Sequence, residues 1–204
     1  MNIHIAKSGP LLKSRKSAGQ RCIDWARANR TETISFTDDI SQADVIFSVF
    51  YSEKIDLNLL KPACKAFNFH AGILPQYRGS GTINFAIINR EDETGITLHE
   101  IDKNIDTGDI ISIEKFPISS EDTAETLMIA AEDTAVSMFI RCFDNLIKGQ
   151  YESFQQSEAA SATYTRRDLQ QAKDLTHYAK AFHLPGKEQA FYFDRNGKKH
   201  FLKW

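Results

Sequence analysis

Short apolar runs and amphipathic segments alternate along the start of the chain. Residues 2–6 alternate polar and apolar side chains before a Ser-Gly-Pro turn, which predicts a short strand. Residues 13–29 carry apolar side chains at helical spacing, which predicts an amphipathic helix on one face of a sheet. Residues 33–36 and 44–50 are rich in β-branched and aromatic side chains, and the second run is almost continuously apolar, as in a strand buried on both faces. This alternation favours an α/β fold with a parallel sheet.

The middle of the chain continues the pattern but contains one long connection. Residues 65–70 predict another strand, and residues 71–81 after it include Pro75 and several glycines. This loop is too long for a simple connection. The pattern then predicts a short helix, a strand, an acidic loop and another strand, at residues 82–89, 96–101, 102–109 and 110–118.

The remaining residues predict one long helix and, further on, a small appendage. Asp122 is a good N-cap for the long helix, and Gly149 follows its end. Residues 155–163 are polar and small, which indicates a linker, and residues 168–182 have a helix-like pattern. The helix presents one stripe to the sheet, formed by Leu127, Ala131, Thr134, Met138 and Cys142.

The end of the chain predicts a β-hairpin. The pair Asn196-Gly197 lies between two aromatic-rich runs at 190–193 and 199–204, which is a strong hairpin signal. Such a hairpin is marginal alone and needs a surface to cover its apolar face, so we expect a homodimer contact through it, or packing on its own domain.

Composition narrows the class of protein. Hydrophobic residues make up 42% and charged residues 25% of 204 residues, which is ordinary globular usage and enough for one principal domain. No apolar stretch approaches the roughly 20 residues that cross a bilayer, and the N-terminus lacks a secretory pattern. We therefore predict a cytoplasmic protein with no membrane partner. A formal charge of −2 gives no drive toward nucleic acid.

Two polar side chains at the end of the predicted strand 65–70 are candidates for chemistry. Asn68 and His70 are two residues apart and share one face of the strand, near the end that borders the ligand crevice of open α/β sheets. An amide donor and a titratable ring suit acyl transfer, because one stabilises an oxyanion and the other manages a proton. A carboxylate from the acidic loop 102–109 would orient the imidazole. A structural pair beside an ordinary turn explains the same residues.

Four sequence motifs strengthen the catalytic interpretation. Four segments follow in order: FNFHAGILPQYRG at 67–79, AIIN at 86–89, TGITLH at 94–99 and IDTGDII at 105–111. Together they resemble the folate-dependent formyltransferase family over residues 44–149. That family includes glycinamide ribonucleotide and methionyl-tRNA formyltransferases and nucleotide-sugar N-formyltransferases.

The resemblance implies a fold, a donor and a set of site residues. It implies a Rossmann-like formyltransferase domain with a mostly parallel sheet, and 10-formyltetrahydrofolate as formyl donor and co-substrate. The catalytic centre is carried over to Asn68, His70 and Asp106, with protonated His70 beside the oxyanion. The neighbours implied for the pterin ring are Phe50, Tyr51, Asp102 and Ile105, although Phe50 could equally belong to the core and Tyr51 to the surface.

Two residues of the long loop are candidates for substrate binding. Arg78 follows Tyr77 and could receive a phosphate or carboxylate through its fork of donors. A solvated loop arginine is the alternative. Three widely spaced cysteines and histidines without HxxxH spacing predict neither a disulfide framework nor a metal site.

The chain also departs from the family pattern. Few residues precede the strand 65–70, so a strand-helix unit looks abbreviated at the N-terminus, and the short tail disfavours tRNA. We therefore expect a catalytic domain at 1–154 and an appendage with a helix and β-hairpin at 155–204. The expected acceptor is a small amine, most plausibly a nucleotide-linked amino sugar. The alternatives are a methionyl-tRNA formyltransferase, a formyltetrahydrofolate hydrolase, and a non-catalytic folate- or nucleotide-binding module.

Overall fold

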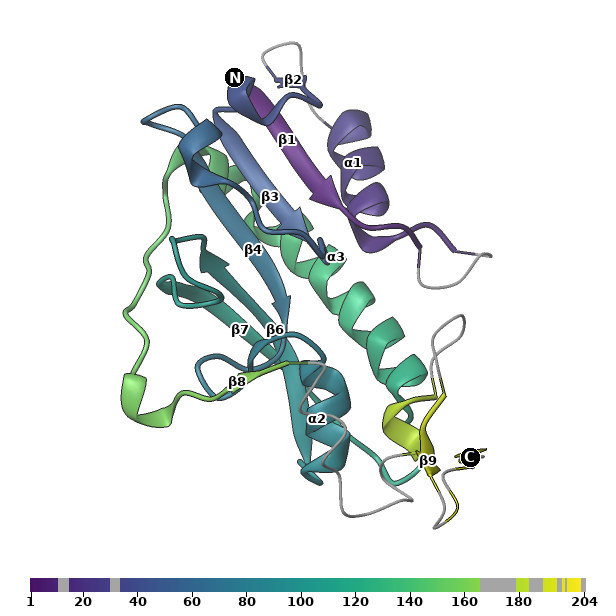
Figure 1. Ribbon diagram of the computed structural model, residues 1–204. Coiled ribbons are helices and arrows are strands. Elements are labelled where there is room, and N and C mark those ends of the chain that lie inside the picture. Colours follow the sequence, from purple (N-terminus) through teal and green to yellow (C-terminus); the bar gives the residue numbers. More distant parts are fainter. Residues whose placement is uncertain are drawn as a thin grey trace.

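The computed structural model describes residues 1–10, 15–29, 34–165, 179–183, 189–193, 196 and 198–202. Its centre is a six-stranded sheet in the order β2-β1-β3-β4-β6-β7 (Figure 1). The first four of these strands run parallel, and β6 and β7 are antiparallel to their neighbours. The predicted α/β fold with a mostly parallel sheet is confirmed. The strands comprise β1 (Asn2–Lys7), β2 (Ser35–Phe36), β3 (Val45–Val49), β4 (Lys65–Ala71), β6 (Glu93–Glu100) and β7 (Ile110–Pro117).

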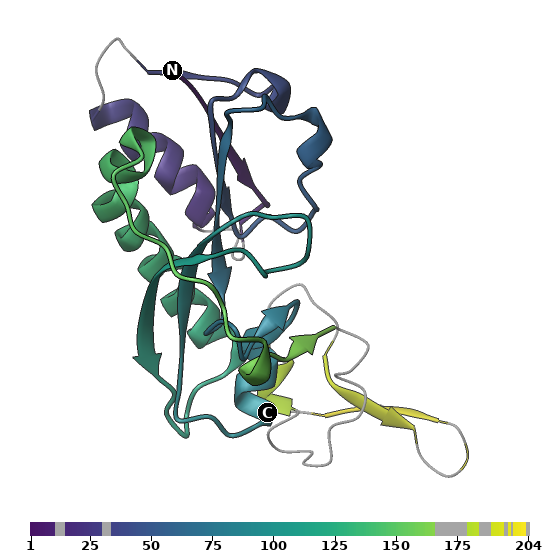
Figure 2. The same ribbon diagram turned by 90° about the vertical axis from the view of Figure 1, so that its left-hand side faces the viewer.

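Two long helices cover one face of this sheet. Helices α1 (Ala18–Asn29) and α3 (Ala124–Lys148) lie side by side on the same face (Figure 2). Aromatic rings from both layers meet there: Phe47 of β3 lies 5.1 Å from Phe139 of α3, and Trp25 of α1 lies 6.0 Å from Phe139. Full burial of one such ring stabilises the fold by about 1.5–3 kcal/mol.

The opposite face has thinner cover. A smaller cluster there includes Ala43 and Ile46, packed under the single-turn 3-10 helices η1 (Ile40–Gln42) and η2 (Leu57–Leu59). These turns connect β2 to β3 and β3 to β4, where a doubly wound sheet would have helices. The first half is therefore abbreviated at these two connections, and every residue of β3 is still buried.

The helix boundaries correct two predictions. Helix α1 begins at Ala18 rather than near residue 13, because Ser17 takes the cap position and its Oγ accepts from the Gln20 N–H at 3.3 Å. Thr123, not Asp122, is the N-cap of α3, and it forms a capping box with Thr126.

The carboxylate of Asp122 instead accepts from the Ser119 backbone N–H at 2.8 Å and from the Thr126 hydroxyl at 2.7 Å, so it stabilises the turn before the helix. At the other end of α3, Gly149 adopts φ 69°, as the predicted C-terminal cap requires.

None of the helices in the described part of the chain combines the length and hydropathy needed to cross a bilayer.

The segment 155–163, predicted as a linker, packs against the long loop that follows β4. Strand β8 (Thr163–Tyr164) pairs in parallel with β5 (Arg78–Gly79) in the long loop after β4. Gln156 is buried, and the short helix η3 (Glu158–Ala160) follows it. The linker prediction is wrong, because a polar and small composition cannot reveal hydrogen bonds made to a distant segment.

The C-terminal region retains the predicted hairpin. Strands β9 (Phe191–Phe193) and β10 (Lys199–Phe201) pair antiparallel. Of the predicted helix 168–182, residues 168–178 lie outside the described residues, as does Trp204. The division into domains at 154 and 155 stays a prediction, although β8 ties the start of the second segment to the first. Between β5 and β6 lies the short helix α2 (Thr82–Ile88).

Candidate active site

The site forms where β4 ends beside β6. Asn68 pairs across the two strands with His99, and His70 pairs with Thr97. Asp106 comes from the acidic loop between β6 and β7, where it adopts a left-handed conformation with φ 54°. The loop needs glycine at position 108, since a Cβ there would lie 1.9 Å from the Glu100 carbonyl oxygen.

The structure brings Asn68, His70 and Asp106 into contact. One carboxylate oxygen of Asp106, Oδ1, accepts from the Asn68 amide at 3.3 Å. The other, Oδ2, lies 3.4 Å from Nδ1 of His70 and accepts from the backbone N–H of Gly79 at 2.8 Å. All three side chains were expected from the sequence, and the carboxylate that the acidic loop supplies is Asp106.

His99 is a member of this cluster that the sequence analysis missed. Its Nδ1 lies 2.7 Å from the carbonyl oxygen of Glu100, so that nitrogen carries the proton. Its Nε2 lies 3.1 Å from the Asn68 amide nitrogen and accepts from it when the ring is neutral. A signal existed, because His99 lies near the end of a strand that leads into the acidic loop, but its partner depends on the antiparallel pairing of β4 with β6.

The other ring nitrogen of His70 also has a protein partner. Its Nε2 lies 2.6 Å from the carbonyl oxygen of Tyr77, to which it donates. Gly72 permits this approach, because a Cβ there would lie 2.9 Å from both atoms. In a neutral His70 the proton therefore sits on Nε2 and the lone pair of Nδ1 faces Asp106.

The buried position of the cluster shifts two pKa values. Burial lowers the pKa of His70 below its ordinary value of 6.5, against the opposing effect of the Asp106 carboxylate. Burial acts to raise the pKa of Asp106, but the charge of His70, the contact with Nε2 of His99 at 3.5 Å and the hydrogen bond from Gly79 outweigh it and bring that pKa to about 2. At neutral pH the site therefore holds a neutral imidazole next to a carboxylate, which corrects the expectation of a protonated His70.

Two side chains predicted to bind substrate have protein partners instead. Tyr77 is 9% exposed, and its hydroxyl donates to Glu91 at 2.6 Å. Arg78 is 4% exposed, so it is not the solvated loop arginine that the sequence allowed. Its guanidinium donates to Gln156 at 2.8 and 3.0 Å and to Glu158 at 3.0 and 3.1 Å. Neither side chain is presented as a free ligand contact.

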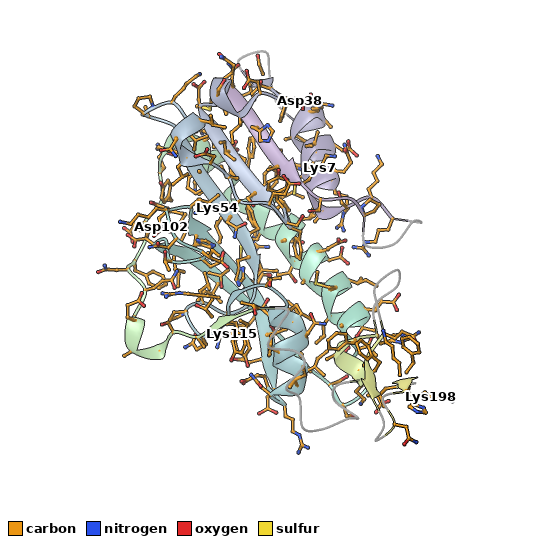
Figure 3. All side chains as sticks on the ribbon, in the orientation of Figure 1. Lys7, Asp38, Lys54, Asp102, Lys115 and Lys198 are labelled. Atoms are coloured by element: carbon orange, nitrogen blue, oxygen red, sulfur yellow. The ribbon has the colours of Figure 1, made fainter. Side chains whose placement is uncertain are left out.

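The two loops predicted to flank the pterin lie next to each other. Phe50 directly follows β3 in a left-handed conformation with φ 52°, and the hydroxyl of Tyr51 after it donates to Glu53 at 3.1 Å. Lys54 from this loop donates to the carbonyl of Lys103 in the acidic loop at 3.1 Å, and Figure 3 shows Lys54 close to Asp102.

The acidic loop is held internally but presents one apolar side chain. Asp102 accepts from the Thr107 hydroxyl at 2.7 Å and from the Asn104 backbone N–H at 3.1 Å, so its carboxylate stabilises the loop. Ile105 is 60% exposed, and an apolar surface of this kind is what the face of a planar ring requires.

A cavity lies at the adjacent sheet edge. Its volume is about 390 Å³, and it opens between the end of β1 and the start of α1. Lys7 of β1 pairs with Val49 of β3, and Val49 pairs with Phe69 of β4. The cavity at the end of β1 therefore lies two strands, or about 10 Å, from the end of β4, along the same edge of the sheet. Its lining residues comprise Lys7, Ser8, Gly9, Pro10, Arg15, Lys16, Ser17 and Gln20.

The Asp106 carboxylate thus contacts an amide and a neutral imidazole at the edge of an α/β sheet, and groups of these three kinds suit acyl transfer. The sequence profile of the formyl transferase family matches residues 13–143. The chain therefore belongs to the formyl transferase family.

Solved structures of three enzymes share the fold. An N-formyltransferase from Helicobacter canadensis, in complex with folinic acid and dTDP-3-aminofucose, is 22% identical with a TM-score of 0.72, covering 88% of this chain and 80% of that one. A sugar N-formyltransferase from a Shewanella species is 17% identical with a TM-score of 0.80, covering 100% and 97%. A methionyl-tRNA formyltransferase from Clostridium thermocellum is 19% identical with a TM-score of 0.70, covering 98% and 96%.

Proposed function

We propose that this chain transfers the formyl group of 10-formyltetrahydrofolate to the amine of a nucleotide-linked sugar, with Asn68, His70 and Asp106 as its catalytic residues. The observation that carries the proposal is the Asp106 carboxylate, which contacts both the Asn68 amide and the His70 ring. Membership of the formyl transferase family supplies the reaction class.

The first step forms the new carbon–nitrogen bond. The acceptor amine attacks the formyl carbon, and the carbonyl electrons move onto oxygen. Nδ1 of His70 accepts the proton released by the amine, because Nε2 is bound to the Tyr77 carbonyl. The resulting imidazolium lies between that carbonyl and the Asp106 carboxylate, which stabilise its charge.

The Asn68 amide stabilises the oxyanion. Both of its N–H groups meet protein acceptors at rest, at 3.1 Å on His99 and 3.3 Å on Asp106. The longer contact to Asp106 opens, and that N–H donates to the oxyanion while His99 holds the other. When the carbonyl re-forms, the bond to the folate nitrogen breaks and His70 returns the proton to that nitrogen.

The folate fits the surface between the loop after β3 and the acidic loop. Phe50 and Tyr51 begin the first loop, and exposed Ile105 offers an apolar contact from the second. The backbone of residues 102–106 borders the same place, so its amide and carbonyl groups supply partners for the polar edge of a pterin.

The cavity at the end of β1 supports a nucleotide-linked acceptor. Lys7 and Lys16 line it together with the start of helix α1, and cationic side chains with helix N–H groups suit a diphosphate. The H. canadensis enzyme was solved with dTDP-3-aminofucose, a molecule that combines a diphosphate with a sugar amine. These two observations favour an amino-sugar nucleotide over a charged tRNA.

Acceptor-dependent formylation tests the proposal. Purified protein is given 10-formyltetrahydrofolate with dTDP- and UDP-linked amino sugars, with charged initiator tRNA, or with no acceptor, and products are measured by mass spectrometry. We expect a mass gain of one formyl group on an amino-sugar nucleotide. Formylation of the tRNA alone would indicate a methionyl-tRNA formyltransferase. Folate turnover without an acceptor would indicate a formyltetrahydrofolate hydrolase, and no turnover would indicate a non-catalytic binding module.

Two further proposals concern the whole protein. We propose a homodimer through the hairpin of β9 and β10, supported by Phe201, which is 54% exposed. A cytoplasmic location, where folates and nucleotide sugars are available, also stays a proposal.

A further inference from the structure

Gln156 is a buried amide that joins three segments distant in the sequence. It is 7% exposed. Its Nε2 donates to the backbone carbonyls of Asp106 at 2.9 Å and Gly108 at 2.7 Å. Its Oε1 accepts from Nε and Nη2 of Arg78 at 3.0 and 2.8 Å. Every donor and lone pair of this amide is therefore used.

The contacts fix the direction of the Gln156 amide. A flipped amide would turn its NH₂ group toward the donors of Arg78 and its oxygen toward two carbonyl oxygens, so four hydrogen bonds would become four repulsions. Arg78 cannot swing away easily, because it is 4% exposed and also pairs with Glu158.

These bonds act on Asp106, whose backbone is left-handed, unlike that of Asn68 and His70. Asp106 has φ 54°, a left-handed conformation that residues other than glycine adopt in only a few per cent of cases, although aspartate is among those that tolerate it best. Gln156 holds the carbonyl of Asp106, and Gly79, next to Arg78, donates to the carboxylate at 2.8 Å. Strand β5 thus holds the side chain of Asp106 directly through Gly79, and it holds the backbone of Asp106 indirectly through Arg78 and Gln156.

We propose that Gln156, held by Arg78, is a positioning residue that sets the Asp106 carboxylate against His70 and Asn68. It touches no reacting atom and acts through Asp106. This inference rests on the proposed function only for its kinetic consequence. The buried arginine predicted to bind substrate instead supports the catalytic carboxylate.

The substitution Gln156→Glu separates positioning from folding. A glutamate keeps the size of the side chain and an oxygen for Arg78, so that buried contact is retained as an ion pair. It loses both donors to the Asp106 and Gly108 carbonyls and places a carboxylate against them. The matched control is Gln155→Glu, the same change at the neighbouring, exposed position.

Kinetics give the first readout. We expect Gln156→Glu to lower kcat about 10- to 100-fold, because small misplacements of catalytic groups have effects of this size, with KM for both substrates within about two-fold of wild type. Gln155→Glu should match wild type. In an Asp106→Asn background Gln156→Glu should have no further effect, since both act through one carboxylate.

The NMR titration of His70 gives a second readout that needs no activity. The groups facing His70 are the Asp106 carboxylate, the His99 ring and the Tyr77 carbonyl. Withdrawal of the carboxylate in Gln156→Glu should lower the pKa of His70, as in Asp106→Asn. A new negative charge by itself would raise the pKa of His70, and Gln155→Glu serves as the control for this effect. Withdrawal of the Asp106 carboxylate and the added charge therefore shift the pKa of His70 in opposite directions.

The outcomes are distinguishable. If wild type is active and Gln156→Glu keeps kcat within two-fold of Gln155→Glu, or raises the pKa of His70, the positioning role is wrong and the proposed function stands. If wild type transfers no formyl group but the pKa of His70 is lower in Gln156→Glu than in wild type, the proposed function fails and the positioning role stands. Should Gln156→Glu not fold, Gln156→Met with Gln155→Met as control removes the same donors without a charge and is held to the same outcomes.

Discussion

Nε2 of His99 lies 3.1 Å from the amide nitrogen of Asn68, directly across the antiparallel pair of β4 and β6. Because Nδ1 of His99 donates to the Glu100 carbonyl, Nε2 of the neutral ring is an acceptor. It can be satisfied only if the amide turns its NH₂ group toward it. His99 and Oδ1 of Asp106 therefore together determine which end of the Asn68 amide faces the reaction.

Replacing His99 by leucine should release the Asn68 amide. We expect kcat to fall about 10-fold with little change in KM, because an oriented donor is lost without loss of a substrate contact. Asn68→Ala should have the larger effect, about 2.7–4 kcal/mol of transition-state stabilisation. Steady-state kinetics of both variants and of the double variant measure this. Additive effects of the two substitutions would show that His99 does not act through Asn68.

Removing the charge of Asp106 should impair turnover without unfolding the protein. Asp106→Asn and His70→Ala are each expected to lower kcat by roughly 10²-fold or more, since acid–base groups commonly contribute about 10² to 10⁴. Thermal unfolding and circular dichroism serve as the folding control. Near-normal turnover by either variant would exclude these residues from catalysis.

The stability of the protein should fall in acid in two steps. The pKa of His70 is lowered in the folded state, so its contribution is present above the unfolded pKa near 6.5 and is lost as pH falls below that value. The pKa of Asp106 is also lowered, to about 2, from an ordinary 3.8. Its contribution, on the order of 2 kcal/mol, is present above pH 4 and is lost toward pH 2.

Denaturant unfolding at several pH values separates the two steps. Asp106→Asn should flatten the lower step and keep the dependence just below pH 6.5. His70→Gln should lose the dependence just below pH 6.5 and also weaken the lower step, because the charge of His70 lowers the pKa of Asp106. A wild-type protein whose stability rises as pH falls from 6.5 to 5 would contradict the assigned direction for His70.

The hairpin should mediate self-association. Phe201 on β10 is 54% exposed and contacts the ring of Phe191 at 6.3 Å, which leaves an apolar surface for a second copy. We expect wild type to sediment as a dimer at micromolar concentration and Phe201→Ser as a monomer. Leu59→Ser, a control at a position 55% exposed in another part of the chain, should stay dimeric. A monomeric wild type would end the dimer proposal and leave the catalytic assignment unaffected.

The sequence by itself determined the elements and the reaction class. Apolar runs and helical spacing predicted β1, β3, β4, α2 and α3 to within a few residues, because local pattern reports which face of an element is buried. The two-residue spacing of Asn68 and His70 placed both on one strand end, and the resemblance of residues 105–111 to the family motif identified Asp106. The geometry of a single strand and a recognisable sequence motif were sufficient to assign these three residues.

Only the tertiary structure decided what supports that centre. The pairing of His99 with Asn68 requires β6 to run antiparallel to β4, and no local pattern fixes the direction of a neighbouring strand. Arg78 and Gln156 belong to polar stretches that resemble solvated loops, and their burial depends on a contact between positions 78 residues apart. A buried polar side chain is tolerated only when a partner makes its hydrogen bonds. For Arg78 and Gln156 that partner is distant in the sequence, so only the fold brings the two together.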